Sequence, residues 1–100
     1  LPKLPLFLPQ SLSNLAWSCA TLRVGTRQLM NAIASSSIRK LLDFSAQGLS
    51  NIAWAFASWS LEDLHLFHAI AEQALPKLGN FTPQSFSNTA WAFASLGWAD

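Results

Sequence analysis

Two amide side chains and an indole recur together along this chain at a fixed interval. A glutamine is followed four residues later by an asparagine and three residues after that by a tryptophan, and this set returns every 37 residues. The members are Gln10, Asn14 and Trp17; Gln47, Asn51 and Trp54; and Gln84, Asn88 and Trp91. Amides can hydrogen-bond the edges of nucleic-acid bases, and indoles can stack on bases. One interpretation is therefore a row of groups that contact a single strand of RNA.

The other interpretation is structural, and it is our expectation for the asparagines and tryptophans. An asparagine in a helix can bond the backbone of a neighbouring unit, and an indole can fill the seam between units. A position that reads bases should vary from unit to unit, but these positions do not vary. We expect the six residues to stack the repeats, and we expect Asn51→Ala to lower the free energy of unfolding by roughly 1–3 kcal/mol.

Positions that do vary, outside the expected core, are the candidates for distinguishing one base from another. On the first helix of each unit they are Ser11, Gly48 and Ser85, and Ser18, Ala55 and Ala92. On the second helix they are Gln28 and His65, and Asn31 and His68. Together with the recurring glutamines and lysines, these polar side chains give the candidate RNA-binding set: Lys3, Lys40, Lys77, Gln10, Gln47, Gln84, Ser18, Gln28, Asn31, His65 and His68.

The lysines Lys3, Lys40 and Lys77 form a second series, with one member in each unit. Two roles remain open for them. A cation at the end of a helix complements the partial negative charge of the helix C-terminus. A row of cations can also contact successive phosphates of a nucleic-acid strand.

The sequence predicts neither catalysis nor a cofactor. A face shared by His65, His68 and Glu72 suggests metal ligands, but the set does not recur and a site needs three or four converging groups, so we predict no metal. The single cysteine, Cys19, is expected to fill a small space in the core. Net charge is +1 with the charges scattered, and no apolar run reaches the ~18 residues of a membrane span.

Self-similarity at this interval is typical of an all-α solenoid of two-helix repeats. We divide residues 1–100 into the end of a preceding second helix (1–6), two repeats (7–43 and 44–80) and a partial repeat with a first helix only (81–100), and we interpret the array as part of a longer one. The final helix would then leave apolar side chains bare, so we expect self-association through Phe86, Phe93 and Trp98.

The local signals place the helix ends. First helices should begin after Ser45 and Thr82, which are good N-cap residues, and end near Ser58 and Ser95. Second helices should begin near Thr26 and near Ser60, where Ser60 and Asp63 have the spacing of a capping box. The expected apolar stripe of the second helix comprises Leu64, Phe67, Ala71, Ala74 and Leu78, and Pro76 should end or kink that helix.

The recurring pattern Phe-x-x-Gln-x-[Leu/Phe]-Ser-Asn-x-Ala-Trp-x-x-Ala resembles the octotricopeptide repeats of organellar gene-expression factors. It is also similar to the helical repeats found before RAP domains and in FAST-kinase-domain proteins. The resemblance implies an α-solenoid that binds single-stranded RNA in a chloroplast or mitochondrion and affects its stability, processing or translation. The alternative is a protein–protein interaction scaffold that uses the same groove; flanking repeats of the same chain would be further partners.

Overall fold

A computed structural model describes residues 8–61 and 63–96, and within these ranges the chain contains helices and no strand. The α-helices are α1 (Pro9–Leu22), α2 (Arg27–Ile38), α3 (Ala46–Ser58), α4 (Leu64–Ala74) and α5 (Pro83–Ser95). Two 3₁₀ helices, η2 (Leu41–Asp43) and η3 (Leu75–Asn80), follow α2 and α4. The predicted all-α class is confirmed.

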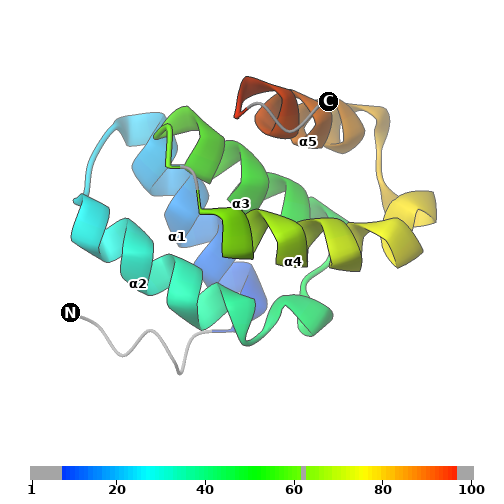
Figure 1. The fold of residues 1–100 in the computed structure, drawn as a ribbon, viewed down its shortest axis with the longest axis horizontal. Coiled ribbons are helices and arrows are strands. Elements are labelled where there is room, and N and C mark those ends of the chain that lie inside the picture. The colour runs from blue at the N-terminus through cyan, green and yellow to red at the C-terminus, as the bar shows by residue number, and fades with distance from the viewer. Residues whose placement is uncertain (1–7, 62, 97–100) are drawn as a thin grey trace.

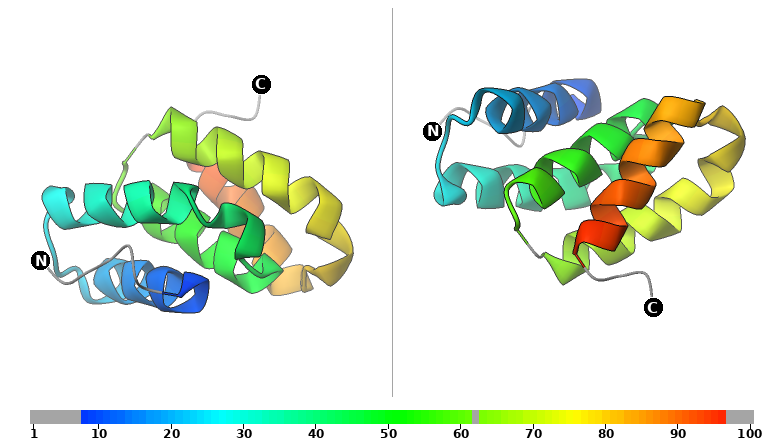
Figure 2. Two further views of the ribbon diagram at one scale, coloured as in Figure 1. Left: turned by 90° about the horizontal axis from the view of Figure 1, so that it is seen from below. Right: turned by 90° about the horizontal axis from the view of Figure 1, so that it is seen from above.

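The helices form two layers (Figures 1 and 2). In one layer α3 packs against α1 on one side and α5 on the other, and α2 and α4 form the other layer. The helices of the first layer begin at Pro9, Ala46 and Pro83, which are 37 residues apart. None of the described helices has both the length and the apolar character needed to cross a bilayer.

The predicted N-caps of the first layer are confirmed for α3 and α5. The hydroxyl of Ser45 accepts a hydrogen bond from the Gly48 amide at 3.0 Å, and Thr82 forms a reciprocal capping box with Ser85. At the equivalent position before α1 the chain carries Leu8, which has no capping side chain, and Pro9 occupies the first helical position instead. The predicted starts of α3 and α5 are therefore confirmed.

The predicted start of the last second-layer helix is wrong. Ser60 does not cap α4; it has a φ of 56° and belongs to the closing turn of α3, where the Leu61 amide donates to the Phe56 carbonyl at 2.9 Å. The cap is Asp63, whose Oδ1 accepts from the Leu66 amide at 3.0 Å. A left-handed residue terminates the preceding helix, so Ser60 is not available to begin the next one.

The expected apolar stripe of the second helix is confirmed in part, since Phe67 and Ala74 are buried and Ala71 is half-buried. Leu64 and Leu78, expected in the apolar stripe, are 53% and 44% exposed. The buried residues of α4 are Leu66, Phe67, Ile70 and Ala74. The expected break at Pro76 is confirmed, since α4 ends at Ala74 and the chain continues as η3.

The core lies between the layers. Its largest fully buried side chains include Met30, Ile33, Phe44, Leu49, Ile52, Phe56 and Phe67. Cys19 is 5% exposed at the edge of this cluster, and burial raises the pKa of its thiol. The side chain therefore stays protonated and packs as a small apolar group, as expected.

Small residues line the seams between α1, α3 and α5. Ser50 is fully buried and donates from Oγ to the Ser85 carbonyl at 3.0 Å. At the preceding seam, a Cβ added to Gly48 would lie 3.6 Å from the Ser13 hydroxyl oxygen. The helices of this layer therefore approach closely through serine, glycine and alanine.

These seams correct the expected base-reading positions on the first-layer helices. Ala55 and Ala92 are fully buried, and Gly48 and Ser85 are also buried. Ser85, Ala55 and Ala92 lie on sides of α3 and α5 that are closed to a ligand, whereas Gly48 lines a hollow between α1 and α3 but offers it no side chain. The matching residues of α1, Ser11 and Ser18, are exposed, because in the described part of the chain no first-layer helix packs beyond α1.

Candidate functional site: the outer face of the first layer

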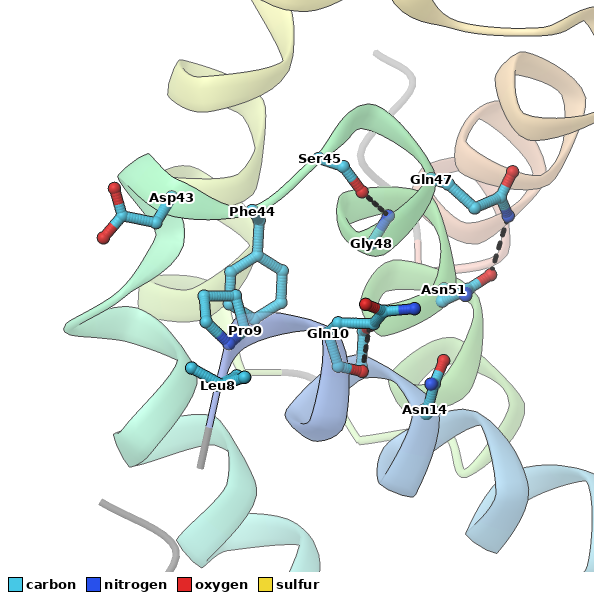
Figure 3. Close-up of a pocket in the computed structure, with 11 residues that line it drawn as sticks. Leu8, Pro9, Gln10, Asn14, Asp43, Phe44, Ser45, Gln47, Gly48 and Asn51 are labelled. Atoms are coloured by element: carbon cyan, nitrogen blue, oxygen red, sulfur yellow. Dashed lines mark hydrogen bonds between the residues drawn. The ribbon is translucent and has the colours of Figure 1, made fainter. Parts of the chain in front are cut away.

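The recurring amides of α1 and α3 meet in one hollow of about 490 Å³ (Figure 3). We call it the amide hollow; Gln10, Asn14, Gln47 and Asn51 supply its amides. Helical spacing places each glutamine one turn before its asparagine, so both project from the same side of a helix. In the equivalent pair on α5, Gln84 is exposed and Asn88 is half-buried.

The hydrogen bond that the structure records for Asn51 stays within α3. Gln47 Nε2 donates to Asn51 Oδ1 at 2.9 Å in an exposed setting (Figure 3). The expectation that Asn51 bonds the backbone of a neighbouring unit is thus not what the structure shows. The hydroxyl of Ser50 makes the buried bond between units instead, because it points into the seam while Asn51 points outward.

A second hollow of about 710 Å³ lies at the other end of the same helices. We call it the indole hollow. The residues that line it include Arg23, Trp54, Ser58, Ser60, Trp91 and Ser95. It combines one cation, two aromatic rings and several hydroxyl groups, which are the groups that proteins use to hold a base and its phosphate.

The three recurring tryptophans lie at equivalent places on α1, α3 and α5, but only one is largely covered. Trp54 is half-buried, whereas Trp17 is 44% and Trp91 is 49% exposed. The rings of Trp17 and Trp54 are 6.3 Å apart with an interplanar angle of 35°. This contact crosses the α1–α3 seam, and it leaves ring surface open to a ligand.

Lys77 bridges two units. Its Nζ donates to the Leu42 carbonyl at 2.9 Å and to the Phe44 carbonyl at 2.7 Å. This differs from both roles left open by the sequence, because the cation complements carbonyls at the end of η2 in the preceding unit rather than its own helix end or a phosphate. Lys40 is half-buried at the equivalent position, and Lys3 lies outside the described residues.

The remaining candidates lie apart from these hollows. Gln28 and Asn31 on α2, and His65 and His68 on α4, are exposed on the second layer. Asn31 lines a separate hollow of about 320 Å³ with Arg27 and Asp63. In the part of the chain that the structure describes, no group of three His, Cys, Asp or Glu residues could hold a metal ion.

Sequence reasoning missed how Arg23, Ser58 and Ser95 contribute to the indole hollow. The signal in the sequence was position, because each lies at the C-terminal end of a first-layer helix, four to six residues after the recurring tryptophan. Gln84 is exposed on α5, and Ser18 is exposed on α1 at the position where its equivalents Ala55 and Ala92 are buried in a seam. Searches against protein-family models, curated proteins and solved structures give no match to this chain.

Proposed function

We propose that this chain is a segment of an α-solenoid that binds single-stranded RNA across the outer face of α1, α3 and α5. Bases would stack on the indoles of Trp54 and Trp91, with Arg23 beside them for a phosphate. The amide hollow would hydrogen-bond base edges further along the strand. The observation that carries the proposal is the indole hollow, whose volume falls within the roughly 300–1,000 Å³ typical of ligand sites.

The repeated geometry supports the solenoid part of the proposal. First-layer helices begin at the same interval, and the left-handed residues Arg23 and Ser60 are also 37 residues apart, each with a φ of 56°. The resemblance of the repeated motif to octotricopeptide repeats supports an organellar RNA and a role in expression rather than catalysis.

The charges predict weak binding with little salt dependence. Net charge is +1, and Lys77 already donates to two carbonyls. One phosphate contact at Arg23 gives a log–log salt slope of about −0.7 for a single strand. Stacking contributes about 1–3 kcal/mol per base, so it supplies most of the affinity, and longer arrays would bind more tightly.

The test is binding of fluorescently labelled single-stranded RNAs of about ten nucleotides, followed by anisotropy and by quenching of tryptophan fluorescence. Asn14→Asp puts a negative charge in the amide hollow, and Arg23→Glu reverses the charge in the indole hollow. We expect each to weaken binding by at least about fivefold. Ser35→Asp is the control, because Ser35 is exposed on α2 in the other layer.

Equal weakening by the control would mean that only net charge matters and would remove the two hollows from the interface. Absence of RNA binding even at low salt would move the assignment to the protein–protein scaffold on this same face. Tryptophan quenching that Arg23→Glu abolishes would place the RNA in the indole hollow.

A further inference from the structure

The turns that close α1 and α3 are copies of one another. Arg23 and Ser60 follow these helices directly or within two residues, and each has a φ of 56°. In both units the backbone amide of the next residue donates to the carbonyl five residues before it, over 3.1 Å after α1 and 2.9 Å after α3. This is the arrangement in which the left-handed residue at a helix end is usually glycine.

The chain keeps a side chain at positions where the backbone favours glycine. The left-handed conformation is uncommon for residues with a Cβ, and residues held in such conformations cluster at sites that contact ligands. The residue type also changes between units: Arg23, Ser60 and, outside the described residues, Gly97 share this position in the repeat. A position that packs one repeat on the next would not carry such a range of size and charge.

Both side chains lie beside the recurring indoles. Arg23 and Ser60 line the indole hollow together with Trp54 and Trp91. A smaller hollow of about 290 Å³ is lined by Arg23, Ser58, Trp59 and Ser60. The closing turns of two successive units therefore face the same open space on the outer face of the first layer.

Packing between units leaves this position open. Helix α3 has α1 on one side and α5 on the other, and these two neighbours bury Ala55 completely. Ser60, at the end of the same helix, is nevertheless exposed, and so is Arg23. The seams close the sides of the first-layer helices and not the turns that follow them, so the equivalent position of a unit with two neighbours stays accessible to a ligand.

The two side chains differ in how strongly they can hold an anion. Arg23 is the cation among the residues that line the indole hollow, and Ser60 brings a neutral hydroxyl to the equivalent turn. A guanidinium can bind a phosphate through two parallel charge-assisted hydrogen bonds, whereas a hydroxyl donates one weaker bond. Lys77, which belongs to the recurring lysines, already donates to two carbonyls.

We infer that the left-handed residue after each first-layer helix is the phosphate-binding position of its unit, and that its side chain determines how strongly the unit holds an RNA strand. Arg23 gives the first unit a strong contact, and Ser60 gives the second a weak one. The inference rests on the proposed RNA binding and adds to it the position that varies the contact from unit to unit. It also accounts for the absence of glycine at positions 23 and 60.

The experiment places an arginine in the second closing turn. Ser60→Arg gives the second unit the side chain of the first, and Arg23 itself shows that this turn accepts arginine at a φ of 56°. Binding of a labelled single-stranded RNA of about ten nucleotides is followed by anisotropy at several salt concentrations. Each phosphate contact contributes about −0.7 to the log–log salt slope, so we expect the slope to change from about −0.7 to about −1.4.

Three further variants provide the controls. Ser35→Arg makes the same chemical change at an exposed position of α2 in the other layer, and it should leave the slope at about −0.7. Arg23→Ser should bring the slope close to zero, since the charged contact is lost. Arg23→Ser combined with Ser60→Arg keeps the net charge of the wild type and should restore a slope of about −0.7.

Thermal melts show whether each variant is folded. Equal steepening by Ser60→Arg and Ser35→Arg would mean that only net charge matters, and it would overturn the inference while RNA binding stands. A slope that Ser60→Arg leaves unchanged would overturn it in the same way. If Ser60→Arg does not fold, Arg23→Ser decides, because a slope that stays near −0.7 in that variant contradicts the inference. Failure of the wild type and of every variant to bind RNA at low salt would overturn the proposed function and the inference together.

Discussion

The seams of the first layer and its outer face both contain residues that recur in every repeat, but for different reasons. Ser13 and Ser50 recur in the seams and are at most 2% exposed. Trp17 and Trp91 recur on the outer face and are nearly half exposed. Recurrence alone does not separate the two groups, but burial does: the serines are closed off by packing, whereas part of each tryptophan ring stays accessible.

The third repeat sharpens this comparison because its seam residues have no described neighbour on one side. Ser87 and Ala90, the equivalents of Ser50 and Ala53, are exposed on α5. The same serine and alanine therefore occur once buried against a neighbouring helix and once exposed to solvent. Pairs of substitutions at equivalent positions can measure what the seam contributes.

Ser50→Leu should have the largest effect on stability. The change removes the hydrogen bond to the Ser85 carbonyl and forces a larger side chain between α3 and α5, where Ser50 is fully buried. Overpacking costs about 1–3 kcal/mol and the lost bond about 1 kcal/mol, so we expect a loss of about 2–4 kcal/mol in a denaturant melt.

Ser87→Leu is the matched control for this prediction. It makes the same chemical change at the equivalent exposed position, and we expect a change within about 0.5 kcal/mol. Equal effects at both positions would mean that the seam is not where the serine acts, and the comparison between seam and outer face would fail.

Lys77→Met should have the next largest effect. It keeps an unbranched apolar stem but removes the donor to the Leu42 and Phe44 carbonyls, so we expect a loss of about 1–3 kcal/mol by chemical denaturation. Arg39→Met, an exposed cation on the end of α2, is the control for loss of charge alone. If Lys77→Met leaves stability unchanged, the bonds to the two carbonyls contribute little, and Lys77 becomes a candidate for phosphate contact again.

How far the sequence predicted the molecule depends on whether a signal was local. The caps Ser45, Thr82 and Thr26 act within a few residues, so the helix starts they indicate are confirmed. The predicted start at Ser60 is wrong because the spacing of a capping box says nothing about backbone conformation. Ser60 adopts the left-handed conformation that closes α3.

The candidate site shows the same division. Helical spacing was enough to put Gln47 and Asn51 on one side of α3, and the structure joins them. It could not show that Ala55 faces a seam, because the rotation of α3 against α1 depends on contacts between helices. Nor could it show Lys77 reaching the Leu42 and Phe44 carbonyls of the previous unit, a contact between residues far apart in sequence.

Ser60→Gly should stabilise the fold modestly. Ser60 has a φ of 56°, a region that costs a residue with a Cβ about 1–2 kcal/mol and that glycine enters freely. The greater entropy of glycine in the unfolded chain offsets part of this gain, which leaves about 0.5–1 kcal/mol. Thermal and denaturant melts measure the change, and Ser58→Gly, at the last residue of α3, should instead destabilise.

Asn51→Ala should have the smallest effect on stability and is the most direct test of the comparison. The exposed bond from Gln47 is worth about 0.2–0.5 kcal/mol as a pair four residues apart in a helix, and alanine regains a similar amount through its higher helix propensity. The two terms nearly cancel, so we expect a change within about 0.5 kcal/mol, in place of the 1–3 kcal/mol that a buried bond between units would cost. Affinity for single-stranded RNA, measured on the same sample, should fall at least about threefold if the amide hollow contacts bases. A loss of stability above about 1 kcal/mol would assign Asn51 to the seams after all, and its recurrence in every repeat would then report packing, as that of Ser50 does.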